Sequence, residues 1–184
     1  MTSFTKAISI NNSSRSFPKR ANIYMQKRLY AEAIRDYNVY FAQIGSENII
    51  LNEYWSRSNA LFEIGEYLKV LQDVESIIRL NPSYHPAFFR KAETYAKMGK
   101  YNESIVYYGD FIERFPSSEY SKSSLYDSST ATAYRGRGMI YQKQKLYKEA
   151  VADLQTAARL YNIAGSIDNE QFCLKLVQDI LKIK

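Results

Sequence analysis

The sequence predicts an all-α fold in which helix–turn–helix units stack on copies of themselves. Three residue types recur in the same order at a spacing of 34 residues: Gly65 and Gly99, Tyr67 and Tyr101, and Pro82 and Pro116. A period of this length is too long for one helix and suits two helices joined by a turn. At 184 residues, 46% of them apolar, the chain is large enough to bury a core as one domain.

Short insertions extend the repeat from two units to four. Tyr30 precedes Tyr67 by 37 residues, which is one period plus three, and Tyr147 follows Tyr101 by 46, which is one period plus twelve. We therefore expect a repeat domain over residues 16–184, with its repeats at about 14–47, 51–84, 85–118 and 131–164.

The first fifteen residues have a different composition. Residues 1–15 are rich in Ser, Thr and Asn, and no acidic residue precedes Glu32. We expect a polar arm over 1–15, followed by a helix capped by Ser16. An acid-poor, Ser-rich start is also typical of organelle transit peptides, so organelle targeting remains an alternative.

Two further segments lie outside the regular period. The Ser- and Tyr-rich insertion 119–130 is expected to form a loop or a ragged extension of the helix that follows it. A last helix is expected at about 168–183, with Asp168 and Gln171 forming a capping box. Its apolar face should cover the fourth repeat near Ala150, Leu154 and Ala157. The residues of that face are Phe172, Cys173, Leu176, Val177, Ile180 and Leu181.

These units resemble the tetratricopeptide repeat (TPR) family, which implies a right-handed superhelical solenoid. Three signature positions carry the resemblance in every unit. The first helix opens with an aromatic residue, has a small residue four positions later, and is followed by an aromatic after the turn. In chain order these are Phe17, Tyr54, Phe88 and Tyr134; Ala21, Ser58, Ala92 and Gly138; and Tyr30, Tyr67, Tyr101 and Tyr147.

The chain also departs from the family pattern. Gly65 and Gly99 fit the left-handed residue that ends a helix, whereas Arg28 and Lys145 stand there in the first and fourth repeats. At four positions where many family members carry leucine, this chain has a basic residue. We expect the aliphatic part of each side chain to pack and its charged group to lie in solvent. These positions are Arg20, Arg57, Lys91 and Arg137.

The sequence gives no sign of an active site, a metal or a cofactor, and we predict that the chain is not an enzyme. His85 is the sole histidine and Cys173 the sole cysteine, whereas a zinc site takes about four ligands. The acidic residues read as solvated helix surfaces. Examples are Glu32, Asp36, Glu103, Asp110, Glu149 and Asp153.

The family resemblance implies a protein-interaction scaffold that binds a peptide segment or a partner helix on the first helices of its repeats. Carried onto this chain by spacing, the peptide-binding residues are Lys19, Asn22, Trp55, Asn59, Phe89, Arg90, Arg135 and Lys143. This surface is aromatic and mildly basic, which favours an acidic segment with an apolar anchor.

Two other kinds of partner fit the sequence less well. Chaperone-binding members grip the Hsp70/Hsp90 tail with five Lys, Asn and Arg residues, and only two of five match here in the better frame. RNA binding is the alternative function, since the net charge is +6 and aromatic residues are frequent. Most of the tyrosines stand at packing positions, however, which argues against nucleic acid.

The composition favours a cytoplasmic protein. A single cysteine excludes an internal disulfide and agrees with a reducing compartment. No apolar run approaches the length of a membrane span, and we expect no such span.

Overall fold

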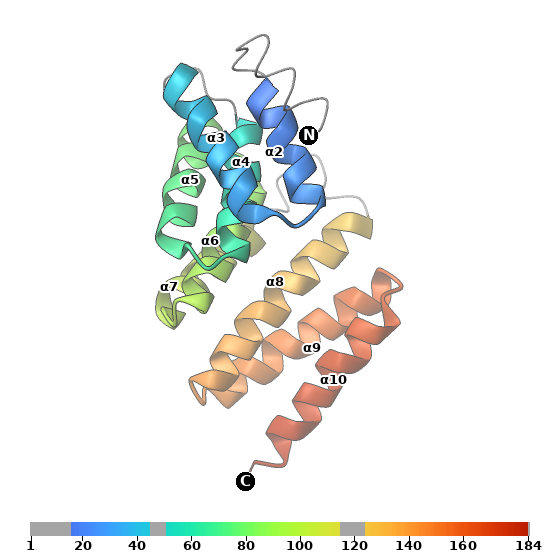
Figure 1. Ribbon diagram of the computed structural model, residues 1–184. Helices are drawn as coiled ribbons and strands as arrows, with labels where there is room; N and C mark the ends of the chain where they lie inside the picture. Colours follow the sequence, from blue (N-terminus) through green and yellow to red (C-terminus); the bar gives the residue numbers. More distant parts are fainter. Residues whose placement is uncertain (1–15, 45–50, 115–123, 184) are drawn as a thin grey trace. The chain divides into compact units, whose positions relative to one another are not determined.

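The structure is a computed structural model that describes residues 16–44, 51–114 and 124–183 (Figure 1). Every regular element within these ranges is an α-helix, so the predicted all-α fold class is confirmed for the described residues. The chain divides into two compact units, Met1–Pro82 and Ser83–Lys184, which are described separately below. No helix among the described residues combines the length and the apolarity needed to cross a membrane.

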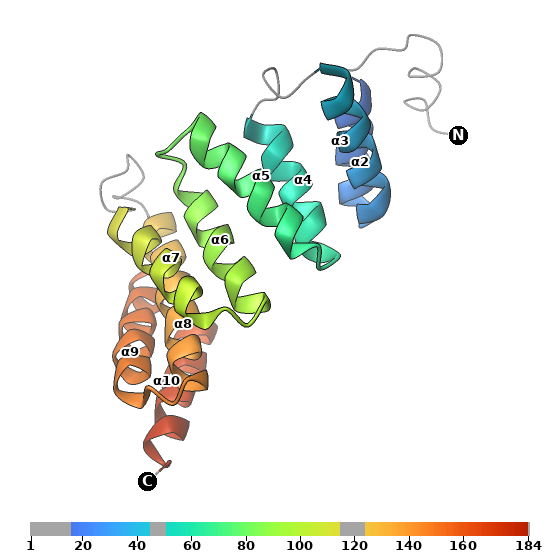
Figure 2. The same ribbon diagram turned by 90° about the vertical axis from the view of Figure 1, so that its left-hand side faces the viewer.

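Unit 1 contains two helix pairs, which Figure 2 shows from the side. They are α2 (Ser16–Gln26) with α3 (Tyr30–Ile44), and α4 (Leu51–Glu63) with α5 (Tyr67–Leu80). Small residues allow the helices of each pair to approach, since Ala21, Ala33, Ser58 and Val70 are fully buried. The tilted ring contact between Phe41 and Tyr54, with centroids 5.1 Å apart, joins the two pairs.

Unit 2 contains two more pairs and one further helix. They are α6 (His85–Lys97) with α7 (Tyr101–Arg114), α8 (Ser124–Lys143) with α9 (Tyr147–Ile163), and α10 (Ile167–Leu181). Helix α10 packs along α9, and Cys173, Val177 and Ile180 enter one core cluster with Ala150 and Leu154 (Figure 1). The terminal helix therefore covers part of the apolar surface of α9.

The turn inside each helix pair has one backbone geometry. Gly65 and Gly99 have φ values of 80° and 74°, and Arg28 and Lys145 take the same left-handed region at 57° and 61°. The amide of the next residue bonds back five residues, as from Leu29 to Tyr24 at 2.9 Å. This is the Schellman arrangement. Repeats one and four therefore keep the turn although a side chain occupies the glycine position.

The basic residues at the unusual positions do not hold their heads in solvent, so that expectation was wrong. The guanidinium of Arg20 donates two bonds of 2.6 Å to Asp36, and Arg137 donates bonds of 2.7 and 3.0 Å to Asp153. Both carboxylates are buried, which also corrects their assignment to solvated surfaces. Each pair joins the two helices of one repeat, because donor and acceptor lie 16 residues apart.

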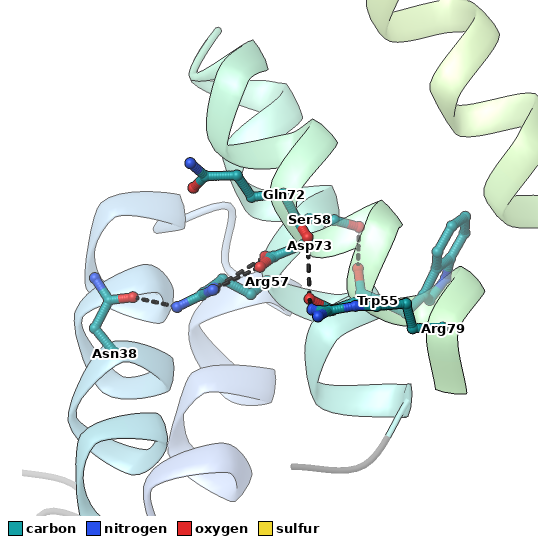
Figure 3. Close-up of polar contacts among 8 residues, drawn as sticks. Asn38, Trp55, Arg57, Ser58, Gln72, Asp73 and Arg79 are labelled. Atoms are coloured by element: carbon teal, nitrogen blue, oxygen red, sulfur yellow. Dashed lines mark hydrogen bonds and ion pairs between the residues drawn. The ribbon is translucent and has the colours of Figure 1, made fainter. Parts of the chain in front are cut away.

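The second repeat has the same ion pair and the third has a substitute. Arg57 bonds both oxygens of Asp73 and also donates to Asn38 at 2.8 Å (Figure 3). In the third repeat the corresponding residues are Lys91 and Tyr107, and the ammonium lies 4.3 Å from the ring centroid. At these two positions a cation lies over a ring, where the other repeats have an arginine and an aspartate.

Two expectations about the terminal helix are wrong, and two about other segments fall wholly or partly outside the described residues. The N-cap of helix α10 is Ser166 instead of Asp168, and its side chain makes no capping bond to a backbone amide, so the Asp168 capping box is wrong. Phe172 and Leu181 are exposed, whereas the sequence placed both on the covering face. The polar arm 1–15 and the first part of the 119–130 insertion lie outside the described residues, and residues 124–130 begin α8.

Candidate functional site

The first helices of consecutive repeats lie side by side within each unit, α2 with α4 and α6 with α8. The eight residues expected to bind a peptide all lie on these four helices. Lys19, Asn22, Trp55 and Asn59 belong to unit 1, and Phe89, Arg90, Arg135 and Lys143 belong to unit 2.

In unit 1, Lys19 and Asn22 are exposed on α2. The buried Tyr37 hydroxyl of α3 donates a 2.7 Å hydrogen bond to Asn22 Oδ1, so the amide is fixed from behind. That bond leaves the amide nitrogen end of Asn22 as the group that can donate to a ligand.

Trp55 and Asn59 lie half-buried on the neighbouring helix α4. The carbonyl of Trp55 accepts a 2.7 Å bond from the Ser58 hydroxyl, and the indole points away from the Arg57–Asp73 pair (Figure 3). The partly exposed indole can therefore offer an apolar surface on α4.

In unit 2, Phe89 and Arg90 follow each other on α6. The Phe89 ring meets Tyr108 and Phe111 edge-on, with centroids 5.7 and 5.3 Å apart, so much of it is committed to packing on α7. Arg90 Nη1 lies 3.2 Å from a Glu93 carboxylate oxygen one turn later. Arg90 therefore already forms an ion pair with Glu93 on its own helix.

Arg135 is the residue around which α8, α9 and α10 converge. Its Nη1 donates a 2.6 Å hydrogen bond to Asn169 Oδ1, and its guanidinium carbon lies 5.4 Å from the Tyr161 ring centroid and 5.9 Å from that of Phe172. Asn169 in turn donates to the Ser166 hydroxyl at 2.9 Å. The guanidinium is therefore held by a hydrogen bond close to two rings.

The charges of Arg90 and Arg135 both act on the hydroxyl of Tyr108. Burial raises the pKa of its hydroxyl, and the nearby Glu93 raises this pKa further, whereas Arg135 and Arg90 lower it. A Cβ atom built on Gly136 of α8 would lie 2.6 Å from the hydroxyl oxygen. Both arginines thus lie near Tyr108. We call the surface formed by Phe89, Arg90, Arg135, Asn169 and Phe172 the Arg90–Arg135 face.

Lys143 is not part of that face. It lies eight residues after Arg135 on α8, about 12 Å along the helix axis, and its ammonium is 5.7 Å from the Tyr101 ring centroid. The structure therefore brings Phe89, Arg90 and Arg135 together in unit 2 and leaves Lys143 apart.

Sequence reasoning missed Asn169, Tyr161 and Phe172 as members of this surface. A signal for Asn169 was available, because it follows Arg135 by 34 residues, which is one repeat period. Continuing the period past the fourth repeat makes α10 the first helix of a further unit. Its residues then continue the series of first-helix positions at which the sequence predicts ligand contacts.

The chemistry of this surface is recognition by charge and ring contacts. Among the described residues, no three His, Cys, Asp or Glu side chains gather where they could hold a metal ion. What the face offers is two guanidinium groups, aromatic rings and an amide, which suit a carboxylate next to an apolar group.

Two family profiles match the chain. Both describe the tetratricopeptide repeat, one over residues 86–118 and the other over 131–164. They fall on the α6–α7 pair and on the part of the α8–α9 pair that begins within α8. A comparison with curated protein sequences found no match.

Solved structures of similar fold span most of the chain. A crystal structure of MamA is 21% identical with a TM-score of 0.72, and the match covers 88% of this chain and 86% of that one. A MamA structure from Desulfovibrio magneticus RS-1 is 13% identical with a TM-score of 0.64, covering 92% and 95%.

A third similar structure is that of YrrB, described as a TPR protein with an unusual peptide-binding site. It is 15% identical with a TM-score of 0.60, and the match covers 99% of this chain and 94% of YrrB. At these identities the likeness concerns the fold. The two profiles thus show that the chain contains tetratricopeptide repeats, and its helix pairs and the similar structures agree with that fold.

Proposed function

We propose that the chain is a non-catalytic protein-interaction scaffold whose Arg90–Arg135 face binds an acidic peptide segment with an apolar anchor. The observation that carries the proposal is the placement of Arg135 close to the rings of Tyr161 and Phe172, with its guanidinium bonded to Asn169. The repeat family and its use as an interaction module support the general class, and the contacts above support the chemistry of the ligand.

Arg135 is the proposed anchor for a carboxylate. Asn169 accepts from only one of its terminal nitrogens, so the guanidinium keeps donors for an incoming carboxylate. Arg90 lies on the same face and would add a second positive charge. The Asn169 bond also restricts the rotation of the guanidinium, which reduces the entropy lost on binding.

Phe172 is the proposed apolar platform. Its ring is 44% exposed at the edge of the Arg135 cluster, where an apolar side chain of the ligand can cover it. A ligand that places a carboxylate on Arg135 and an apolar group on Phe172 would therefore use two contacts on neighbouring helices.

In unit 1 we propose a second contact surface formed by Lys19, Asn22, Trp55 and Asn59. Trp55 would supply apolar area, and the exposed Lys19 and Asn22 would supply hydrogen-bond donors. Each unit can be tested by itself, because the two sets of residues do not overlap.

The proposal can be tested with immobilised peptides. An array of acidic peptides with and without a Leu or Phe next to the carboxylate would be probed with the full chain. Selected peptides would then be titrated by isothermal calorimetry against wild-type protein and Arg135→Gln. We expect the variant to lose about tenfold or more in affinity, which corresponds to about 1.4 kcal/mol.

A matched control is Arg159→Gln, which removes an exposed arginine from α9 instead. Binding should persist in this variant. If Arg135→Gln and Phe172→Ala both bind every selected peptide with wild-type affinity, the face is not the site. Displacement of the peptides by single-stranded RNA at low salt would point to the RNA-binding alternative and overturn the proposal.

A further inference from the structure

Helix α10 carries an exposed apolar stripe that none of the residues 16–44, 51–114 and 124–183 covers. Ile167, Leu174 and Leu181 are 60%, 42% and 58% exposed. Because they are spaced seven residues apart, they fall within about 40° of one another around the helix. The exposed Gln171 and Gln178 alternate with them and complete a seam with steps of three and four residues.

An apolar groove adjoins one end of this stripe. It lies between α9 and α10 and has a volume of about 620 Å³. Val151, Ala152 and Tyr147 line it from α9, and Ile180, Leu181 and Ile183 line it from the other side. Leu181 belongs to both stripe and groove, so together they form one apolar surface that runs the length of α10.

The repeat architecture predicts which direction a helix on this surface would take. Asn169 stands one repeat period after Arg135, so α10 occupies the place of a first helix. A first helix in this family of folds pairs with a second helix that runs antiparallel to it, as α8 does with α9 (Figure 2). A helix that covers the stripe is therefore expected to be antiparallel to α10.

The charges beside the stripe identify a suitable occupant. Asp168 is exposed in the first turn of α10, and Lys182 is exposed at the other end. An antiparallel second α10 would set Asp168 of each copy against Lys182 of the other and would also oppose the helix dipoles. The stripe would meet itself, with Leu174 on Leu174 and Ile167 at the groove beside Leu181.

We propose that α10 is a self-association surface that pairs with α10 of a second copy of this chain in antiparallel orientation about a two-fold axis. Such a contact is isologous, so it closes as a dimer. A single helix pair buries less area than a standard stable interface, so the dimer should be weak. We expect a dissociation constant of roughly 100 µM.

One pair of like charges beside the seam should oppose the association. Lys175 lies on the Lys182 side of the seam near its middle, and the two-fold axis would bring it close to its own copy. Lys182 also contacts Asp179 at 3.6 Å, but this exposed pair is worth little and can be exchanged. Lys175→Gln should therefore tighten the dimer, an effect that a non-symmetric partner surface would not produce.

The test is sedimentation equilibrium of the full chain between about 10 µM and 1 mM, the range that brackets the expected constant. Wild type should pass from monomer to dimer. Leu174→Glu should raise the dissociation constant at least tenfold, because two carboxylates would meet at the axis. Leu68→Glu is the matched control, since Leu68 is 68% exposed on α5 of unit 1 and should leave the dimer unchanged.

A charge exchange tests the orientation. Asp168→Lys and Lys182→Asp should each weaken the dimer when studied alone. An equal mixture of the two should restore it, because each lysine then faces an aspartate of the other copy. A wild-type chain that stays monomeric at about 1 mM, or a dimer that Leu68→Glu disrupts and Leu174→Glu does not, would overturn the proposal.

Discussion

The guanidinium of Arg57 binds both carboxylate oxygens of Asp73, with Nε to Oδ2 at 2.9 Å and Nη2 to Oδ1 at 2.5 Å. The Asp73 side chain is 1% exposed. Removing the arginine would leave a charge in the interior of the second repeat (Figure 3). We therefore expect Arg57→Leu to lower the free energy of unfolding by about 3–5 kcal/mol.

The stability lost in Arg57→Leu should be greatest at neutral pH and should shrink as the pH falls. Burial raises the pKa of Asp73, and the hydrogen bonds and charge of Arg57 oppose that rise. Without Arg57 the folded-state pKa rises further above the unfolded value. The penalty should then be full above the folded-state pKa and shrink as the pH falls toward the unfolded value near 3.8.

Urea unfolding at several pH values between neutrality and the unfolded-state pKa measures this effect. Arg35→Leu is the control, because Arg35 and Glu32 form an exposed pair at 3.4 Å and should contribute less than about 1 kcal/mol. An Arg57→Leu variant as stable as the Arg35→Leu control at neutral pH would contradict the assignment.

A glycine at the left-handed position of the first or fourth repeat should stabilise the fold. Lys145 has φ of 61°, a conformation that costs a residue with a side chain about 1–2 kcal/mol. Glycine removes this cost but loses about 0.5–1 kcal/mol through the entropy of the unfolded chain. We expect Lys145→Gly to raise the free energy of unfolding by up to about 1 kcal/mol.

Gly99→Ala is the reciprocal control, measured in the same urea titration. A Cβ atom at Gly99 meets nothing within 4 Å, so any destabilisation comes from its φ of 74° alone. We expect a loss of about 1 kcal/mol. Equal stability of both variants with wild type would show that the turns tolerate either residue.

Two helical glycines in unit 2 should respond to alanine in opposite directions. A Cβ on Gly136 would lie 2.6 Å from the Tyr108 ring and hydroxyl, whereas a Cβ on Gly109 would lie 3.5 Å from Arg137 Nη1. Overpacking should make Gly136→Ala destabilising by about 1–3 kcal/mol. Gly109→Ala should stabilise by up to about 1 kcal/mol through helix propensity.

Thermal unfolding of the two variants under identical conditions makes this comparison. If Gly136→Ala raises the melting temperature as much as Gly109→Ala does, Tyr108 does not pack against α8 as described.

The docking of α10 can be followed through its cysteine. Cys173 is fully buried against α9, and burial raises the pKa of its thiol, so a disulfide reagent should react only when α10 opens. Val177→Ala removes a neighbouring core contact worth part of about 1.5–3 kcal/mol. We expect labelling to accelerate by about tenfold or more.

Lys175→Ala provides the control when all variants are labelled well below the roughly 100 µM expected for dimerisation, because its exposed side chain lies on the same helix outside the core. Labelling should then proceed at the wild-type rate. Rapid labelling of wild type at low protein concentration would contradict a docked α10.

The sequence predicted the helices better than the contacts between them. The 34-residue period and the packing positions were sufficient for the all-α fold, because they repeat with the same geometry. The Arg–Asp pairs were missed since each aspartate was judged singly as a surface residue. Their constant separation of 16 residues, seen from Arg20 to Asp36, was the available signal.

Phe172 shows a different limit of sequence reasoning. It stands at the border of the apolar face of α10, where helical periodicity alone cannot assign a side. The ring contacts Arg135 of α8 rather than the core, and that contact depends on how three helices converge. A long-range relationship of this kind leaves no periodic trace in the sequence.

The ion pairs also bear on how such an array can change over time. Since Arg20 and Asp36, like Arg137 and Asp153, belong to the two helices of one repeat, each buried charge is neutralised within its own module. A duplicated, deleted or transplanted repeat would carry both partners with it. The junctions of an enlarged or shortened array would therefore need compatible shapes only, and no complementary buried charge from the adjoining module.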